Sequence, residues 1–478
     1  MAVSIIEQQP LYEQMPVGQE IVFVVSNNDA VANQLKVKFC AEIHINGVSP
    51  ADPNSSTDII GTFKTTPNNA GVGIFDFRNI IESYVKADNM AANGSLYKTT
   101  VTTADVRHPI HLIDSYSFNN NLISYLAIRF SVEYLGATDT AGNQDDDVVR
   151  IQDGTEQNSD LYTLFDGYVK HTDTLDIFDD DFGFNMTDFF PALAVFPALT
   201  DKRFLTNAPT TQYANLEDYG TVAFWQPSDA ASLLVHRMFF EYFDSTGASL
   251  GTNVMVKHAG TGGYANWSEK AKKQILFFGC FPGNLQNWST NFATAVANGL
   301  SYYTVRAEDI TAAPSLRAYT IHVNCPNGKG YESIRICWLN QWGAWDYYTF
   351  TKKSVKSIST KGTTYQQLGG TWNEGVYRLD SYRGGKKSFR VNATEKIKMN
   401  TDFVSEDDTV MFEELINSPE VYLLEGYQND GTFSALNNYV TPVRLTTSSF
   451  TRKTIANDRL MQYTFEIEKS KTLRTQSI

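Results

Sequence analysis

The sequence lacks any apolar run close to the roughly 20 residues that a membrane-spanning helix needs. Its first residues, Met1 to Glu7, have neither the positive charge nor the following apolar stretch of a secretory leader. We therefore expect a protein that is made in a cytoplasm, has no secretion signal and does not enter a membrane. Long runs of Ala, Leu, Glu and Lys are also missing, which argues against a helical protein.

Cysteine is scarce, and the four cysteines, at positions 40, 280, 325 and 337, form no C-x-x-C pair. Their spacing indicates neither a zinc knuckle nor a disulfide framework. Because an unpaired cysteine behaves as a small hydrophobic residue, we predict buried free thiols.

Basic charge is scarce in the first 350 residues, where 21 Lys and Arg stand against 38 Asp and Glu, a net charge of −17. From position 351 onward, 18 basic and 15 acidic residues give +3. The acidic body argues against direct nucleic-acid binding, because phosphate contacts need a basic stripe. The basic end is suited to an acidic partner, such as the acidic part of a neighbouring copy, and salt would then weaken the assembly.

Motifs of catalysis and cofactor binding are missing as well. The sequence has no G-x-S-x-G nucleophile elbow and no cysteine in an activating setting. His108 and His111 flank Pro109, which blocks the helical spacing of metalloproteases, so we expect a surface loop. Segments 178–184 and 259–264 lack the context of an EF-hand and of a dinucleotide loop. We predict no enzyme, no cofactor and no metal, although paired glycosidase carboxylates, which meet only in the fold, stay open.

Aromatic residues are plentiful, at 13% of the chain, and together with frequent glycine they favour strands and turns. Apolar and polar residues alternate over 35–45, which predicts a long strand with one buried face. Similar strands, punctuated by turns, recur along the chain. We predict a mainly β protein: tandem β-sandwich modules of immunoglobulin or fibronectin type III kind over 1–175 and 176–385, then a small β-rich domain with one helix over 386–478.

Three local features complete this prediction. Asp76 is placed to cap a short helix, and the acidic segment 136–160 is predicted to be an exposed excursion. Ser405 and Asp408 predict the start of a helix in the last domain. Its apolar stripe consists of Met411, Phe412, Leu415 and Ile416.

The segment 334–350 is the most distinctive, since it holds three of the seven tryptophans. Its alternation and the turn around Gly343 predict a β-hairpin. A large ring buries roughly 150 to 250 Å² of surface, so the six large rings of this hairpin together bury far more apolar area than two strands need. We therefore expect the hairpin to lie in a domain core or at a domain junction. A ligand-stacking platform and a protein interface are the alternatives. The residues of this structural motif are Trp338, Asn340, Trp342, Gly343, Trp345, Asp346, Tyr347 and Phe350.

Residues 337–350, which read C-W-L-N-Q-W-G-A-W-D-Y-Y-T-F, resemble the W-L-N-x-x-G-x-W-D-Y-x-x-F hairpin of virion structural proteins from tailed bacteriophages of Bacteroidetes, crAss-like phages included. Segments 73–85, 418–424 and 457–468 are similar to further motifs of these proteins. Ala344 stands where relatives are expected to have glycine. This difference strains the turn little if Gly343 is the residue with positive φ.

The resemblance implies a tail component of the virion: a ring, hub-associated, neck or baseplate protein without catalytic residues. Such a protein forms a homo-oligomer and contacts other tail, neck or portal-proximal proteins. A carbohydrate-binding or host-receptor-binding tail protein is a second hypothesis, and it requires exposed, coplanar rings. A hydrolase of cell-surface polysaccharide is a third.

Overall fold

The computed structural model describes residues 3–11, 13–92, 108–114, 116–138, 144–151, 155–168, 202–226, 235–256, 274–309, 311–324, 330–371, 374–406, 408–426, 439–447, 449, 461–471 and 473–477. The predictions for segments 178–184 and 259–264 and for Cys325 lie outside these residues. The chain divides into two compact units. Unit 1 comprises Met1–Asn324 and Leu339–Asp346, and unit 2 comprises Cys325–Trp338 and Tyr347–Ile478.

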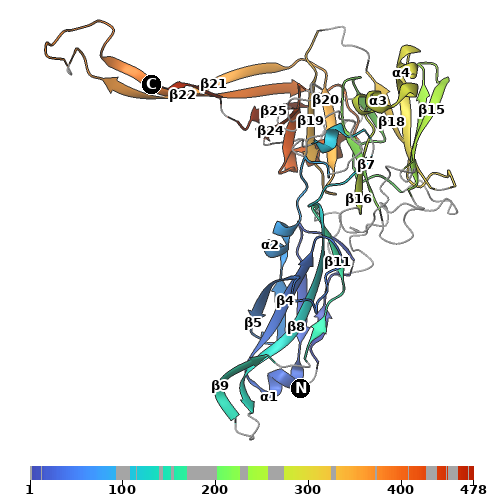
Figure 1. Ribbon diagram of the computed structural model, residues 1–478, viewed down its shortest axis with the longest axis vertical. Coiled ribbons are helices and arrows are strands. Elements are labelled where there is room, and N and C mark those ends of the chain that lie inside the picture. The colour runs from blue at the N-terminus through green and yellow to red at the C-terminus, as the bar shows by residue number, and fades with distance from the viewer. Residues whose placement is uncertain are drawn as a thin grey trace. The chain divides into compact units, whose positions relative to one another are not determined.

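The first part of unit 1 consists of two sheets around one apolar core (Figure 1). The smaller sheet has the order β1 (Ile5–Gln8), β3 (Val22–Ser26), β6 (Val72–Asp76). The larger sheet has the order β2 (Gln14–Pro16), β11 (Tyr162–Phe165), β8 (Ile123–Thr138), β4 (Leu35–Asn46), β5 (Ile59–Thr65), with β9 (Gln144–Ile151) and β10 (Gln157–Asn158) also on β8. Short helices α1 (Asn28–Asn33), α2 (Arg78–Ile81), η1 (Glu82–Tyr84) and η2 (Ile110–Leu112) join the strands.

The alternation over 35–45 forms β4 as predicted, and Phe39, Ala41 and Ile43 on its inner face are fully buried. Across the core, the ring of Phe23 on β3 lies 5.7 Å from that of Phe130 on β8. The opposing inner faces make this part a β-sandwich.

Two of the local predictions meet different outcomes. The N-cap of α2 is Phe77, so the cap predicted at Asp76 is wrong by one residue, although the Asp76 carboxylate accepts the backbone N–H of Arg78, the first residue of the helix, at 3.1 Å. The exposed excursion over 136–160 is wrong in part, because β9 pairs antiparallel with β8. Pairing with a long neighbouring strand outweighs the acidic composition of this segment.

The second part of unit 1 holds two further sheets. One has the order β13 (Thr221–Trp225), β16 (Ile275–Gly279), β7 (Tyr116–Ser117). The other has the order β12 (Thr211–Ala214), β18 (Tyr319–Val323), β17 (Tyr302–Glu308), β14 (Arg237–Phe243), β15 (Ser249–Val256). Helices α3 (Pro282–Trp288) and α4 (Thr290–Ala297) follow β16.

The described residues of unit 2 form an eight-stranded sheet, which the helix α5 accompanies. The strand order is β20 (Trp345–Phe350), β19 (Ile334–Leu339), β23 (Val421–Leu424), β24 (Val440–Leu445), β25 (Thr464–Lys469), β22 (Gly385–Asn400), β21 (Val355–Gln367), with β26 (Leu473–Ser477) also on β22. Helix α5 (Asp408–Asn417) begins two residues after the start that a cap at Ser405 predicts, although the predicted pair is in contact: the Asp408 carboxylate accepts the N–H of Ser405 at 2.8 Å and its hydroxyl at 2.9 Å. Met411, Phe412 and Leu415 are buried.

The fold is therefore mainly β, with several separate sheets and few helices, as predicted. Cys40, Cys280 and Cys337 are free and buried, as predicted. Within the described residues, every helix is too short or too polar to cross a bilayer. The division into three modules stays a prediction; its boundary at 385/386 falls on the first residues of β22.

Replacing Phe23 by Ala tests the sandwich core of unit 1. Phe23 is fully buried against the rings of Phe77, Phe130 and Tyr162. Truncation leaves a cavity, and we expect the free energy of unfolding to fall by about 3 to 5 kcal/mol. Hydrogen exchange of the β3, β4 and β8 amides measures this loss locally. Ile74→Ala on β6, whose side chain is 54% exposed, is the control and should change protection little; equal effects of the two changes would contradict the assignment.

Candidate functional site

The eight motif residues of the aromatic hairpin are buried, and none of their side chains is more than 6% exposed. Trp338 and Phe350 are fully buried, and Trp345 is 2% exposed. A stacking platform needs ring faces open to a ligand, which these residues do not offer. Residues 334–338 and 347–350 of the hairpin belong to unit 2, whereas Leu339–Asp346, which holds the turn and the adjoining strand ends, belongs to unit 1.

Asn340 organises the turn of the hairpin. Its Oδ1 accepts the backbone N–H groups of Trp342 and Ala344, both at 3.0 Å. Its Nδ2 donates to the carbonyl of Leu205 at 2.9 Å. Because a buried backbone N–H without a partner is costly, one amide side chain stabilises the turn and a distant segment of unit 1 together.

Gly343 takes φ +73°, as the prediction for Ala344 required. A Cβ at Gly343 would lie 2.3 Å from the carbonyl oxygen of Asp166. Next to it, the carbonyl of Gln341 accepts the N–H of Tyr168 at 3.0 Å. The turn therefore packs backbone to backbone against the segment that follows β11.

Asp346 is buried beside this turn, where its Oδ1 accepts the hydroxyl of Thr206 at 2.5 Å. Burial disfavours the charged carboxylate and raises its pKa to about 6, while hydrogen bonds from Thr206 and Asn340 act in the opposite direction.

His111 lies under the hairpin, and the predicted surface loop is wrong for this residue, which is fully buried. Its Nε2 is 2.7 Å from Oδ1 of Asn89. The centres of its ring and the Trp345 ring lie 5.5 Å apart, and the two rings pack edge to face. The tryptophan ring supplies an apolar cover that the local sequence around Pro109 does not reveal. His108 is half-buried, and burial lowers its pKa.

The hairpin residues that belong to unit 2 pack within that unit. Nη1 of Arg335 donates to the Thr349 hydroxyl at 2.7 Å, and its guanidinium lies 5.0 Å from the Tyr347 ring centre. The ring centres of Tyr348 and of Phe412 on α5 lie 4.9 Å apart. The hairpin residues in unit 1 and those in unit 2 thus both contribute to packing.

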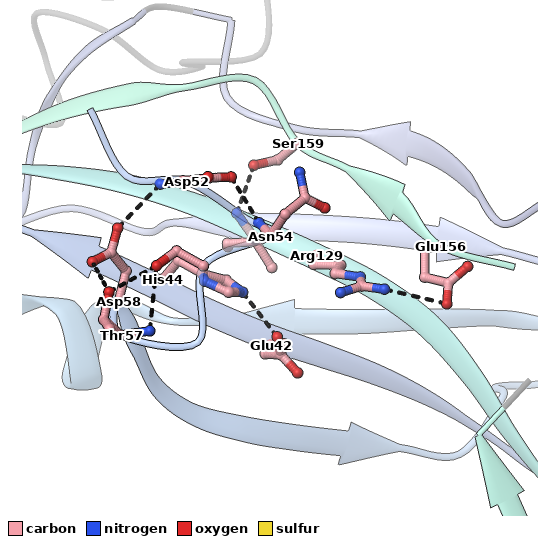
Figure 2. A network of polar contacts seen from close by, with 11 residues as sticks. Glu42, His44, Asp52, Asn54, Thr57, Asp58, Arg129, Glu156 and Ser159 are labelled. Carbon is pink, nitrogen blue, oxygen red and sulfur yellow. Dashed lines mark hydrogen bonds and ion pairs between the residues drawn. The ribbon is translucent and has the colours of Figure 1, made fainter. Parts of the chain in front are cut away.

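A polar network on the sandwich of unit 1 is the second candidate (Figure 2). On β4, Nε2 of His44 and Oε1 of Glu42 lie 3.0 Å apart, at hydrogen-bond distance. In the loop after β4, the Asp58 carboxylate accepts Asn46 Nδ2 at 3.1 Å and the N–H of Asp52 at 3.2 Å. Such bonds between Asx side chains and nearby backbone shape turns. The described residues contain no group of three or more His, Cys, Asp or Glu that could hold a metal ion.

An aromatic row crosses the less buried face of the five-stranded sheet. Tyr213, His322, Tyr302 and Phe243 are cross-strand neighbours on β12, β18, β17 and β14. Successive ring centres lie 5.2, 5.2 and 4.9 Å apart, and the planes differ by 25°, 32° and 14°. The rings cover one another's faces, an arrangement that stabilises a sheet by roughly 0.2 to 1 kcal/mol for each pair. Tyr213, on the edge strand, is 63% exposed.

The comparisons with known proteins are sparse. No family model and no curated protein matches the sequence. Among solved structures, the chain matches the cryo-EM reconstruction of native E. coli alpha-2-macroglobulin, with 10% sequence identity and a TM-score of 0.17. The match covers 83% of this chain and 22% of that chain. A likeness of this quality bears on neither fold nor function.

Replacing Gly343 by Ala tests the close packing of the turn. The change combines a positive φ, which costs about 1 to 2 kcal/mol for a residue with a Cβ, with a steric overlap against Asp166. Gly299→Ala is the matched control, because Gly299 has φ +87° and no atom within 4 Å of a Cβ. We expect Gly343→Ala to lower the thermal midpoint clearly more than the control does. Equal shifts would show that the turn tolerates the added methyl group.

Asp346→Asn tests the buried carboxylate. The pKa of Asp346 is raised above its ordinary value of 3.8 to about 6, so the folded state holds the proton more tightly than the unfolded state does. Its contribution to stability is present below pH 4 and is lost as pH rises to 6 and above. We expect the thermal midpoint of Asp346→Asn, measured relative to that of the wild type, to increase as pH rises from 4 to 7. A pH-independent difference would contradict the raised pKa.

Proposed function

We propose that this chain is a structural component of a bacteriophage virion tail: a ring, hub-associated or baseplate protein that forms a homo-oligomer and contacts other tail proteins. The proposed localisation is the tail of the virion, after synthesis in the host bacterial cytoplasm. The modules are proposed to be of immunoglobulin or fibronectin type III kind.

One observation carries the proposal: the motif rings lie inside the units, whereas large apolar side chains are exposed along an extended part of unit 2. The buried motif serves packing, as in a rigid building block. Exposed apolar side chains on an extended element favour binding to another macromolecule over binding a small substrate in a pocket. The motif resemblance supplies the tail as the setting.

The carbohydrate- or receptor-binding alternative has support at one place, the exposed Tyr213 at the end of the aromatic row. The other rings of the row, His322, Tyr302 and Phe243, are only partly exposed and lie against one another, so they do not form an open platform. A glycan array with wild type and Tyr213→Ala separates the functions: specific binding that the substitution abolishes favours the receptor binder.

The mass of the purified full-length chain tests the structural role. We expect sedimentation velocity to give one closed homo-oligomer, and immunogold labelling of virions to mark the tail. A chain that stays monomeric at all attainable concentrations, or label confined to the capsid, would contradict the proposal. Hydrolysis of host-surface polysaccharide by the purified chain would favour the third hypothesis instead.

A further inference from the structure

Strands β21 and β22 form a long two-stranded ribbon, residues 355–400, that projects from the sheet of unit 2 (Figure 1). The first ten residues of β21 are all exposed. β22 also pairs with β25 through residues 396–400 and with β26 through residues 390–393. Beyond these, residues 364–367 and 385–388 pair only with each other in the described structure. A ribbon without further strands or a covering layer is marginally stable in water.

The tip of the ribbon lies within 368–384, and its described residues, 368–371 and 374–384, have an organised structure. The Thr371 hydroxyl accepts the N–H of Arg378 at 2.8 Å and donates to the carbonyl of Val376 at 2.7 Å. Gly370 has φ +69°, and a Cβ there would lie 2.5 Å from the ring of Tyr377. Local hydrogen bonds and close packing therefore give the tip a defined shape.

Apolar side chains on this tip point into solvent. Leu379 is 83% exposed, the highest value among the large exposed apolar residues, and Tyr382 is 68% exposed. Leu368, Val376 and Tyr377 of the tip are also exposed, as is Phe389 on the adjoining strand β22. Large apolar residues gathered on one small projecting structure mark an interaction surface.

The charge of the ribbon is opposite to that of the rest of the chain. Residues 355–400 hold nine basic and three acidic residues, a net +6, so the remainder of the chain, whose total is −14, carries −20. Lys361, Lys386 and Lys398 form no ion pair with any described residue. Complementary charge of this size favours association between copies and orients it.

We propose that the ribbon of one subunit docks on the acidic residues 1–350 of a second copy of this chain, with the apolar tip as its anchor. The inference rests on the proposed homo-oligomer. It goes further by naming the contact: a heterologous interface, ribbon to body, of the kind that closes into a ring when the rotation between copies allows. A nucleic acid would satisfy the lysines, but it gives no reason for exposing Leu379 and Val376.

Shortening the ribbon tests the anchor. Thr363 and Arg390 are cross-strand partners, so replacing residues 364–389 by Asn-Gly closes a two-residue hairpin at that point. The point variant Leu379→Asp tests the tip with the ribbon intact. Phe403→Asp is its control, because Phe403 is 60% exposed in unit 2 outside the ribbon. We expect the dissociation constant of the oligomer, from sedimentation equilibrium, to rise at least tenfold for both ribbon variants and to stay unchanged for the control.

Charge reversal tests the complementarity. Lys361→Glu with Lys386→Glu places negative charge on the ribbon, whereas Lys36→Glu with Lys38→Glu makes the same charge change on the acidic body. We expect the first pair to weaken assembly severalfold and to reduce its salt dependence, and the second pair to leave assembly unchanged or tighter. Equal weakening by both pairs would show general repulsion and overturn the docking.

A photocrosslinker at position 379 identifies the occupant directly, in a mixture of light and isotope-labelled chains. Crosslinks from position 379 of one copy to residues 1–350 of another support the proposal. Crosslinks only within one chain, or duplex DNA binding that Lys361→Glu with Lys386→Glu abolishes, overturn it. A monomeric wild type would defeat the homo-oligomer itself, whereas a wild-type oligomer that survives ribbon shortening would defeat only the ribbon contact.

Discussion

A buried hydrogen-bonded turn is the constraint on which the aromatic hairpin depends. Its backbone donors are removed from water, so each needs a partner within the protein. Asn340 supplies two acceptor contacts inside the turn and one donor contact to the Leu205 carbonyl. Gly343 allows the turn to approach the backbone of Asp166. The polar residues of the motif therefore make it possible to bury a turn among tryptophan rings.

The same dry environment explains why the motif has the composition of a binding site without the accessibility of one. Burial raises the pKa of Asp346, a property that often marks catalytic carboxylates. Here the carboxylate is bound to the Thr206 hydroxyl and has 4% exposure, so its position serves packing. A perturbed carboxylate beside aromatic rings indicates function only where a substrate can reach it.

The sequence predicts the strands with one wet and one dry face, because alternation is then imposed by burial. β4 follows this rule in part: Phe39, Ala41 and Ile43 are buried and Lys38 is exposed, but Cys40 and His44 on the other face are buried as well. Helix α5 is the helical counterpart, with an apolar stripe that is mostly buried. Strand β21 of the ribbon escaped prediction because its first ten residues are exposed on both faces, and its Lys, Ser and Thr residues therefore carry no alternating pattern. The partners of the turn escaped as well. Thr206 lies 140 residues before Asp346, and no local rule joins them.

The hairpin and the ribbon differ in how much of their apolar surface the single chain buries. In the hairpin, every motif ring is covered by protein, and the stability gained by burial is realised within one subunit. In the ribbon, residues 355–364 and the apolar tip remain in water, so the single chain gains no such stability from them. Tip residues that are held in shape by their own hydrogen bonds lose little conformational entropy when they are covered. A partner that covered the ribbon would therefore add burial free energy that the single chain does not gain, which is the physical reason that an extended, preorganised element suits assembly.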